Sequence, residues 1–418
     1  MSSRTRNDHL VHHQQRSDRS EGERPVVILA GCGYGAMASI QALHGLAQVI
    51  AINPYPYQVN SGMTTRLLSG RFSPEMVKIP LLPHFQEMGV HYLQGKVTQV
   101  FPDRKQLQVN TDQGFQLLNY DVLLLNVGRQ VADHGVSGLE HAFKVRPMQQ
   151  LVQARHQIES CWQRAAKGET TSGLLTFAVV GGGFSGVELV GELYDLCQDL
   201  SRQTGVPRTS ARLILVSRRE PALETSARFS QLIRESLQKL GVEILYPARA
   251  NQITSSLVTV QSQNHADPLK IDCQTTLWCA GLQVPAWLAE SGLPTAPDGS
   301  VRVDQCLRVQ GYDSILAMGD CAHFERASGE PLPKVGVYAV REGPVAAKNL
   351  AHLVKGEPLQ PFEPQKTVFI SVTVGNRVAV MQKGPLIFRG YIATFLKNLF
   401  DWLYMRRVKS VNWRDFFY

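Results

Sequence analysis

Two glycine-rich turns are the parts of this sequence whose residue types and spacing point most directly to chemistry. The first has the spacing G-x-G-x-x-A and the second G-x-G-x-x-G, and each stands between a short apolar run and a helical pattern. In such a turn the first glycine permits a tight bend, the second lets a pyrophosphate approach the backbone, and the third small residue keeps the helix close to the strand. The residues are Gly31, Gly33, Tyr34, Gly35 and Ala36 in the first turn, and Gly181, Gly183, Phe184, Ser185 and Gly186 in the second.

The elements that must position these turns can be read on both sides of them. The apolar runs at residues 26–30 and 174–180 are continuous and rich in β-branched residues, as in buried parallel strands. Further strand patterns end at Asn53 and Ser217, so the chain holds two strand–turn–helix–strand units. We therefore predict an α/β fold with two Rossmann-like dinucleotide-binding domains and a C-terminal α+β segment.

The residues that end the second strand of each unit bear on which nucleotide it binds. An acidic side chain usually stands there and holds a ribose hydroxyl. The first unit has Asn53, which can hydrogen-bond a hydroxyl without charge assistance. The second unit has Ser217, Arg218 and Arg219, and guanidinium groups suit a 2′-phosphate. Either these arginines favour NADPH or they coat a solvated turn, and the sequence inclines only slightly toward NADPH.

A third signal lies at Gly319 and Asp320, which follow an apolar strand pattern at residues 315–318. A carboxylate at the end of a strand can accept hydrogen bonds from a ribityl chain, or it can cap the next turn. Because two dinucleotide turns stand in the same chain, we favour the ligand interpretation.

Composition limits the class of protein. The chain has 418 residues, 44% apolar and 19% charged, with a net charge of +8, which suits two or three soluble domains. None of its seven cysteines forms a C-x-x-C pair, so we expect no disulfide framework and no metal site, and a reducing, cytoplasmic setting. Residues 1–24 are polar and lack an apolar core, which predicts a disordered tail rather than a secretory signal.

Together these motifs resemble the two-dinucleotide flavoproteins of the pyridine-nucleotide oxidoreductase superfamily, and among them type II NADH dehydrogenases. The stretches that carry the resemblance are GCGYGA, YDVLLLNVG, VVGGGFSGVELVGEL, LWCAG and SILAMGDCA, in the family's order. The resemblance implies FAD on the first turn, with Asp320 at its ribityl chain, and NAD(P)H on the second. It implies a catalytic position for Glu188 near the nicotinamide, and it puts Gly128 and Gly281 where the chain crosses between domains.

The resemblance also implies that the NAD(P)-binding domain is inserted within the FAD-binding domain. We expect the FAD-binding domain at residues 25–165 and 282–353, the NAD(P)-binding domain at residues 166–281, and the C-terminal segment at residues 354–418.

The electron acceptor depends on a stretch that departs from the family. Type II dehydrogenases usually carry A-Q-x-A-x-Q beside the quinone, whereas residues 336–341 read GVYAVR and lack both glutamines. The stretch is still expected to begin a helix beside the flavin, with Val337 and Tyr338 at the cofactor. Two other stretches, residues 60–79 and 332–350, resemble a flavoprotein often fused to selenide, water dikinase.

Thiol chemistry is not favoured by the sequence. Disulfide reductases of the superfamily have a cysteine pair on the helix of the FAD-binding domain, and residues 37–70 contain no cysteine. Sulfide:quinone oxidoreductases need two cysteines flanking the flavin, for which Cys161 and Cys321 could be considered. Because Cys321 adjoins Asp320, a packed structural role is the better interpretation.

The C-terminal part of the chain is basic and aromatic. Residues 377–418 contain eight Lys or Arg and two Asp, and residues 391–410 have a helical period with polar residues such as Lys397 and Asp401 on one side. The opposite, apolar arc comprises Ile392, Phe395, Leu396, Leu399, Phe400, Trp402 and Leu403. This helix either packs on the protein's own core or in a dimer interface, or it lies in the plane of a membrane, which we favour.

These observations predict an FAD-dependent NAD(P)H dehydrogenase that passes electrons to a membrane quinone without pumping protons, bound peripherally on the cytoplasmic side. Two alternatives stay open: a soluble reductase of a small electron carrier or a selenium- or sulfur-linked partner, and a non-enzymatic redox-sensing flavoprotein. A homodimer is conceivable, and nucleic acid is not an expected partner because no nucleic-acid-binding motif accompanies the positive charge.

Overall fold

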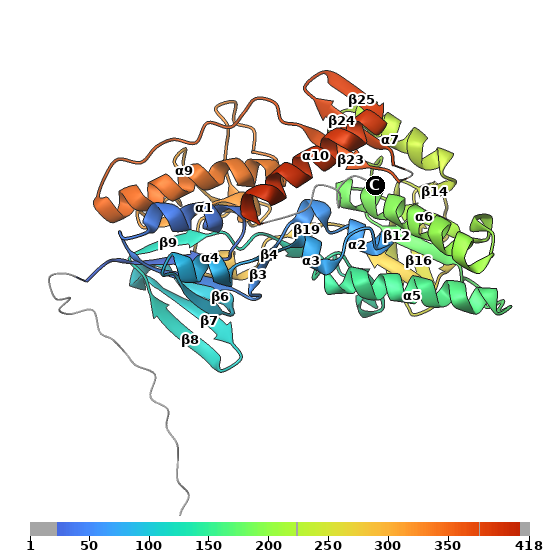
Figure 1. The fold of residues 1–418 in the computed structure, drawn as a ribbon, viewed down its shortest axis with the longest axis horizontal. Helices are drawn as coiled ribbons and strands as arrows, with labels where there is room; N and C mark the ends of the chain where they lie inside the picture. Colours follow the sequence, from blue (N-terminus) through green and yellow to red (C-terminus); the bar gives the residue numbers. More distant parts are fainter. Residues whose placement is uncertain (1–22, 223–224, 376, 410–418) are drawn as a thin grey trace, which may run out of the picture. The chain divides into compact units, whose positions relative to one another are not determined.

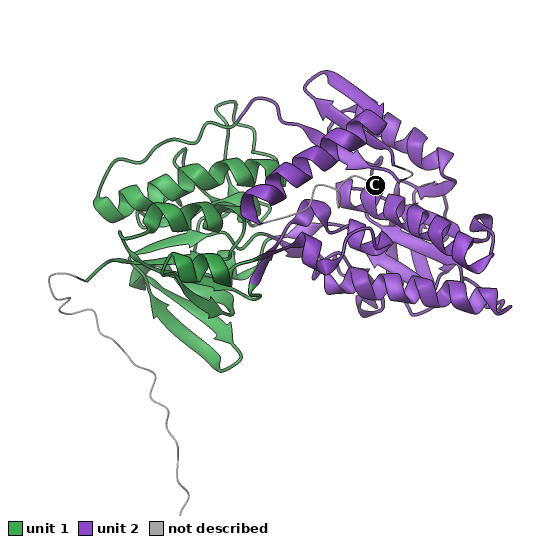
Figure 2. Ribbon diagram, in the orientation of Figure 1, with its two compact units in different colours: residues 1–56, 80–128, 284–364 green, residues 57–79, 129–283, 365–418 purple. Residues whose placement is uncertain are grey.

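The computed structural model describes residues 23–222, 225–375 and 377–409. Figure 1 shows its helices and strands, and Figure 2 colours the two compact units into which the chain divides. Unit 1 comprises Met1–Pro56, Pro80–Gly128 and Val284–Pro364, and unit 2 comprises Tyr57–Ile79, Arg129–Gln283 and Gln365–Tyr418. The predicted tail, residues 1–24, lies almost wholly outside the described residues.

Unit 1 is built on a five-stranded parallel sheet. The strand order is β21 (Ile315–Ala317), β9 (Val122–Leu125), β1 (Val26–Ala30), β2 (Gln48–Asn53) and β5 (His91–Gln94). Strand β1 is central and nearly all of its residues are buried, as its continuous β-branched and apolar run predicts. The first glycine turn therefore begins at the carboxyl end of the central strand.

Unit 2 repeats this topology with different strands. Its parallel order is β11 (Phe143–Lys144), β18 (Thr275–Trp278), β12 (Thr176–Val180), β13 (Arg212–Val216) and β14 (Val242–Leu245). Strand β12 is central and leads into the second glycine turn. The predicted α/β class with two Rossmann-like units is confirmed.

In unit 1 two helices pack against each other beside the first turn. They are α1 (Tyr34–Leu43) and α9 (Gly336–Lys355), which lie side by side in Figure 1. A Cβ at Gly343 would lie only 3.3 Å from the Cα of Gly35, so small residues on both helices permit this close approach. Helix α9 begins where the sequence predicted a helix and continues through Pro344.

Unit 2 contains the longer helices α5 (Gln149–Ala166), α6 (Phe184–Thr204), α7 (Ala227–Lys239) and α10 (Tyr391–Val408). Helices α5 and α6 pack with the parallel sheet around a core that includes the fully buried Trp162. This core shields the apolar side of α6, whose other side carries Glu188 and Glu192.

Three antiparallel sheets of three strands each are also found among the described residues. Their strands are β6 (Lys96–Phe101), β7 (Gln106–Thr111) and β8 (Gly114–Asn119) in unit 1, and β15 (Ala248–Ile253), β16 (Leu257–Ser262), β17 (Leu269–Asp272), β23 (Ile370–Thr373), β24 (Ala379–Lys383) and β25 (Leu386–Gly390) in unit 2. Strands β23 to β25 and α10 form the predicted C-terminal α+β segment.

Short elements connect these layers. They are β3 (Tyr57–Val59), α2 (Arg66–Ser69), α3 (Pro74–Val77), β4 (Lys78–Pro80), α4 (Leu82–Glu87), β10 (Gln130–Val131), β19 (Leu282–Gln283), α8 (Trp287–Glu290), β20 (Val301–Arg302) and β22 (Ala322–His323).

The compact units and the predicted domains divide the chain differently. In the sequence, residues 129–283 of unit 2 lie between segments of unit 1. Unit 2 also takes in residues 57–79 and helix α5, which the sequence analysis assigned to the FAD-binding domain. Compactness and cofactor contact are separate properties, so the assignment of residues to cofactors stays a prediction.

Candidate functional site

The first glycine turn lies against Asn126, the residue that directly follows strand β9. Gly31 has a φ of +92°, and a Cβ there would collide with the carbonyl oxygen of Asn126, so the turn requires glycine. The backbone N–H of Gly31 donates to the carbonyl of Ile52 at 2.8 Å, which fixes the turn to strand β2. The turn is thus rigid and leads directly into α1.

The side chain of Asn126 faces this turn with an unused donor. Its Nδ2 atom is buried and has no hydrogen-bond partner among the described residues. It lies 2.9 Å from where a Cβ of Gly33 would be, and its Oδ1 lies 3.4 Å from the corresponding point at Gly319. A buried amide donor without a partner is costly unless a ligand supplies an acceptor. Asn126 lies within the YDVLLLNVG stretch but was not among the predicted site residues.

Asn53 is engaged by its own chain. Its Oδ1 accepts a hydrogen bond from the backbone N–H of Cys32 at 3.1 Å, and its Nδ2 donates to the carbonyl of Tyr55 at 2.8 Å. An asparagine here therefore shapes the glycine turn. The predicted contact of Asn53 with a ribose hydroxyl stays a prediction.

The predicted ribityl site, Gly319 and Asp320, is held by a buried glutamate. Glu342 on α9 accepts a hydrogen bond from the Gly319 N–H at 2.5 Å. Burial raises the pKa of Glu342, and this hydrogen bond and Lys334 lower it by less. Asp320, Lys334, Tyr338 and Glu342 line one small cavity, so the structure brings together the strand end and the start of α9 that the sequence singled out separately.

The second glycine turn has the same construction in unit 2. Gly181 has a φ of +119°, and a Cβ there would collide with the carbonyl oxygen of Cys279. Its N–H donates to Val216 at 2.8 Å. Phe184 begins α6 and packs edge-on against Phe229, with ring centroids 6.4 Å apart, while Ser185 is exposed. The turn leaves the N-terminus of a long helix open for an anion.

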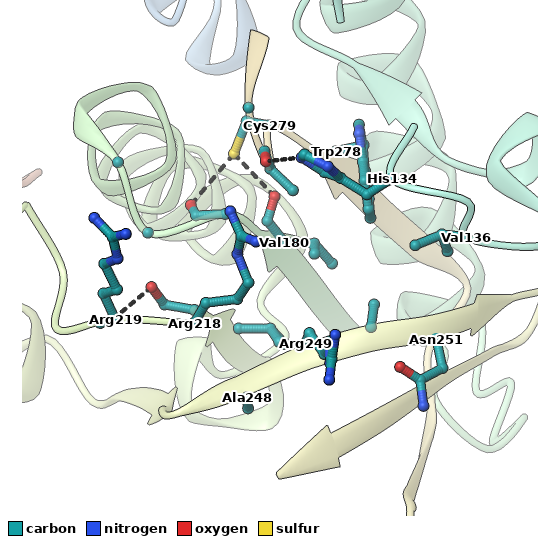
Figure 3. Close-up of a pocket in the computed structure, with 18 of the residues that line it drawn as sticks. His134, Val136, Val180, Arg218, Arg219, Ala248, Arg249, Asn251, Trp278 and Cys279 are labelled. Atoms are coloured by element: carbon teal, nitrogen blue, oxygen red, sulfur yellow. Dashed lines mark hydrogen bonds between the residues drawn. The ribbon is translucent and has the colours of Figure 1, made fainter. Parts of the chain in front are cut away.

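A cavity of about 540 Å³ opens over this turn (Figure 3). Its lining includes the glycines of the turn, the loop after β13, the first residues of β15, and a loop that carries His134. The predicted residues that line it are Gly181, Gly183, Ser217, Arg218, Arg219 and Gly281. His134 Nε2 lies 2.8 Å from the carbonyl oxygen of Ala280, which places the imidazole at the rim of the cavity.

Positive charge dominates the cavity. Arg218, Arg219 and Arg249 surround it in Figure 3, and all three side chains are exposed. The one carboxylate in the lining, Glu220, forms an ion pair with Arg234 at 3.2 Å. Arg218 and Arg219 were predicted from the sequence, whereas Arg249 was not, because it lies on a strand more than twenty residues further along the chain.

Glu188, predicted to be catalytic, lies in a buried cluster and not in the cavity lining. Its Oε2 accepts a hydrogen bond from the Thr65 hydroxyl at 3.1 Å, and its Oε1 lies 3.3 Å from Lys397 Nζ. The backbone N–H of Thr373 also donates to Oε1, at 3.3 Å. The carboxylate is thus held in place by three separate segments of unit 2.

Helix α10 extends this cluster from its polar side. Lys397 lies 3.9 Å from Asp401 on the same helix, and Arg66 pairs with Asp401 at 3.1 Å and donates to the side chain of Asn398 at 2.9 Å. Burial alone lowers the pKa of Lys397, but attraction to Glu188 and Asp401 raises it by more, so its pKa lies above the ordinary value. We name these four residues, Arg66, Glu188, Lys397 and Asp401, the α10 charge cluster.

Much of the predicted apolar arc of α10 is exposed, although Leu396 and Trp402 of the arc pack against buried hydrophobic residues of unit 2. Ile392 is 72% exposed and Phe395 53% exposed, whereas Lys397 and Asn398 are buried. The period of the helix was predicted correctly, and the interpretation in which its apolar arc packs on the protein's own core holds for Leu396 and Trp402 but not for Ile392 and Phe395.

The cysteines are poor nucleophiles. Cys161 and Cys321 are both buried, and burial raises the pKa of each thiol, that of Cys321 to about 11. Thiolates, not thiols, attack sulfur or flavin carbons. The structural role predicted for Cys321 agrees with its contacts to the carbonyls of Leu125 and Met318. Among the described residues no group of metal-ligating side chains is found, and no helix there is long and apolar enough to cross a bilayer.

Known proteins of one family are similar to this chain over most of its length. The model of the family described as pyridine nucleotide-disulphide oxidoreductase matches residues 25–343. A curated type II NADH:quinone oxidoreductase of Staphylococcus aureus (strain MSSA476) is 27% identical to the chain, and the match covers 91% of the chain and 94% of that protein.

Solved structures share the fold. NDH2 from Plasmodium falciparum in complex with NADH aligns with a TM-score of 0.81 at 17% identity, covering 94% of this chain and 96% of that one. The sulfide:quinone oxidoreductase of the hyperthermophilic bacterium Aquifex aeolicus aligns with a TM-score of 0.74 at 16% identity, covering 92% and 91%. At these identities the likeness shows the fold alone.

Proposed function

This chain belongs to the pyridine nucleotide-disulphide oxidoreductase family, and from that membership we propose that it is an FAD-dependent NAD(P)H dehydrogenase that delivers electrons to a membrane quinone. The observation that carries the proposal is the pair of parallel sheets with the same strand order, each with a glycine turn after its central strand. The relatives named type II NADH:quinone oxidoreductase support quinone as the acceptor. The Aquifex enzyme's substrate is not proposed, because the thiols considered for it are buried.

FAD fits the residues of unit 1. The N–H groups at the start of α1 and the free donor of Asn126 would bind its phosphates, and Asp320 would accept hydrogen bonds from its ribityl hydroxyls. Glu342 fixes the backbone of Gly319 and so orients Asp320. When bound, FAD supplies the capacity to accept a hydride and to release electrons one or two at a time. The chain's contribution is to bind, orient and keep water away.

NAD(P)H fits the cavity of unit 2. Its pyrophosphate would lie on the Gly181–Gly183 turn at the N-terminus of α6, where backbone N–H groups and the helix dipole favour an anion. Cys279 lines the cavity, but its thiol contacts the carbonyl of Val180 at 3.2 Å, and burial raises its pKa to about 12. No metal-ligating group is found among the described residues, so the chain's part in the reaction is to hold the nicotinamide ring in position.

We propose peripheral attachment to a membrane through the exposed arc of α10, on the cytoplasmic side. Ile392, Phe395, Phe400 and Leu403 are exposed on this helix, and Arg406 and Arg407 are exposed near its end. Apolar side chains flanked by arginines are typical of helices that lie in a lipid headgroup region. The α10 charge cluster, in turn, would hold the helix to unit 2 by its polar side.

Flavin content tests the cofactor assignment directly. Purified protein should show a flavin absorption spectrum that is bleached anaerobically by NADPH or NADH and restored by a short-chain benzoquinone. An Asp320→Ala variant should lose flavin by at least about tenfold in affinity, since a charge-assisted hydrogen bond is removed. Asp313→Ala, which changes a surface carboxylate in the same unit, should retain it. Colourless wild-type protein that stays colourless after FAD is added contradicts the proposal.

Vesicle flotation tests the membrane part. Full-length protein should float with phosphatidylcholine vesicles that contain phosphatidylglycerol, and Ile392→Ser with Phe395→Ser should reduce the bound fraction about tenfold or more, because two apolar side chains no longer leave water. Leu386→Ser, which alters an exposed leucine on β25, is the matched control. Truncation before α10 is a poorer test because it also removes Lys397 from Glu188. Binding that is unchanged in the double variant, or dimerisation through this arc, contradicts the membrane assignment.

A second candidate acceptor has one observation in its favour. Residues 336–341 lack both glutamines that the type II family usually carries beside its quinone. A soluble reductase of a small electron carrier would need neither these glutamines nor a membrane. If the reduced flavin is reoxidised faster by ferricyanide and small proteins than by any quinone tested, this function replaces the first.

A further inference from the structure

We infer that the cavity of unit 2 selects NADPH over NADH, and that Arg249 on β15 completes a 2′-phosphate site with Arg218 and Arg219. The inference rests on the proposed function, because it takes the cavity to bind a nicotinamide dinucleotide. It names the reductant and adds a specificity-determining residue that is distant in sequence from the glycine turn.

The end of β13 lacks the acidic group that binds an unphosphorylated ribose. Ser217 occupies that position and is buried, and its hydroxyl donates to the carbonyl of Arg219 at 2.6 Å. This hydrogen bond shapes the loop from Ser217 to Arg219. An NADH-selective site usually presents a carboxylate to the two ribose hydroxyls here, and this loop presents guanidinium groups instead.

Arg249 is placed beside that loop by a backbone hydrogen bond. The N–H of Ala248 donates to the carbonyl of Ser217 at 2.8 Å, which ties the start of β15 to the end of β13. Ala248 and Ala250 are buried and Arg249 is exposed, and all three line the cavity, with the Arg249 side chain drawn at its border in Figure 3. Two arginines from the loop after β13 and one from β15 thus border one cavity.

None of these three arginines has an anionic partner among the described residues. Arg212, at the other end of β13, forms two hydrogen bonds of 2.7 Å with Glu243, so this part of the protein does pair arginines where carboxylates are near. Three neighbouring, unpaired guanidinium groups repel one another unless an anion lies between them. Arginines that merely coat a solvated turn need not converge on a cavity.

Among the described residues that line the cavity, Glu220 is the one carboxylate that could replace the missing acidic group, and it is already paired with an arginine. It pairs with Arg234 on α7 at 3.2 Å, and the same Arg234 nitrogen donates to the Tyr246 hydroxyl at 3.1 Å. A phosphate at the ribose 2′ position adds about −1.5 to −2 charge at neutral pH, which three guanidinium groups can match bidentately. NADH leaves these charges unneutralised.

The test measures binding of adenosine 2′,5′-bisphosphate and 5′-ADP to the flavin-loaded full-length protein by calorimetry at low salt. Adenosine 2′,5′-bisphosphate should bind at least about tenfold tighter than 5′-ADP. Arg249→Ala, Arg218→Ala and Arg219→Ala should each weaken it about tenfold and change 5′-ADP binding less than about twofold. Arg249→Lys should recover part of the loss, and Arg228→Ala, an exposed arginine on α7 outside the cavity, is the control for net charge.

Equal affinities for the two probes, or the same loss in Arg228→Ala as in Arg249→Ala, overturn the inference. So does flavin reduction that is faster with NADH than with NADPH at equal concentrations, although the proposed dehydrogenase function then survives. Selective binding of the bisphosphate by a protein whose flavin neither nucleotide reduces has the opposite meaning: the phosphate site stands and the dehydrogenase fails.

Discussion

The cavity of unit 2 and the α10 charge cluster of the same unit differ in how their cationic side chains are buried and paired. In the cluster, two cations and two anions lie within 3.9 Å of a partner, and the side chains of Arg66 and Lys397 are at most 9% exposed. Among the described residues of the cavity, three exposed arginines lie near one carboxylate, that of Glu220, which forms an ion pair with Arg234. In the cluster each charge pairs with an opposite charge of the same unit, whereas the three arginines of the cavity pair with no carboxylate among the described residues.

This difference separates structural charges from ligand-binding charges more reliably than residue type does. A buried charge without a partner is strongly unfavourable, so the partners of Lys397 must come from the fold itself. An exposed arginine costs little while it is solvated, so its partner can arrive later as a ligand. The family resemblance marks Glu188 as catalytic, yet Glu188 is a buried charge whose partners come from the fold itself.

The largest expected effect on stability follows from a substitution in the α10 charge cluster. Lys397→Met leaves Glu188 buried without its cation, and we expect the free energy of unfolding to fall by about 3–5 kcal/mol. Chemical denaturation followed by circular dichroism measures it. Adding Glu188→Gln to the same variant removes the uncompensated charge and should restore part of the loss. If Lys397→Met costs less than about 1 kcal/mol, the cluster is not a structural anchor.

A substitution in the cavity should lower the free energy of unfolding by less, and only when a ligand is present. At one hundred times its Kd, adenosine 2′,5′-bisphosphate should stabilise the wild type by about 2.7 kcal/mol. In Arg218→Ala, with affinity about tenfold lower, the same concentration should give about 1.4 kcal/mol. Without ligand, the variant should unfold within about 0.5 kcal/mol of the wild type. A large loss without ligand would mean that Arg218 is structural.

The pH dependence of stability should differ between the two regions in the alkaline range. The pKa of Lys397 is raised above its ordinary value of 10.5 by Glu188 and Asp401, although burial alone would lower it. A group whose folded pKa is raised stabilises the protein fully below its unfolded pKa, and this contribution is lost as the pH rises through the folded value. The stability difference between wild type and Lys397→Met should therefore narrow above pH 10.5.

Arg218→Ala provides the contrast, because arginine stays charged throughout that range. Its stability relative to the wild type should not change with pH. Parallel unfolding curves for wild type and Lys397→Met across the alkaline range would contradict the ion pair between Lys397 and Glu188.

The sequence was sufficient for features whose cause is local. The two turns were predictable because the glycines at 31 and 181 have positive φ, which a few adjacent residues encode. The parallel strands were predictable from continuous apolar runs. The helical period of α10 was likewise readable from residues 391–410.

What the sequence could not supply was the set of partners from distant segments. Asn126 reaches the first turn from another strand, and Arg249 reaches the cavity from β15. The partners of Lys397 and Asp401 on α10 are Glu188 and Arg66, which lie about two hundred or more residues away in the sequence. A helical wheel shows where the polar side is, but it cannot show that the fold provides buried ions for that side to meet.

The smallest expected effect on stability concerns an ion pair that is neither buried nor part of the cavity. Arg212 and Glu243 form a bidentate ion pair on the edge of the unit 2 sheet, with side chains 48% and 45% exposed. Both are solvated in the unfolded and folded states, so Arg212→Ala should cost no more than about 1 kcal/mol. Its effect should shrink further in 1 M salt, where the Debye length is about 3 Å. A cost near that of Lys397→Met would show that pairing alone, and not burial, decides which charges stabilise this fold.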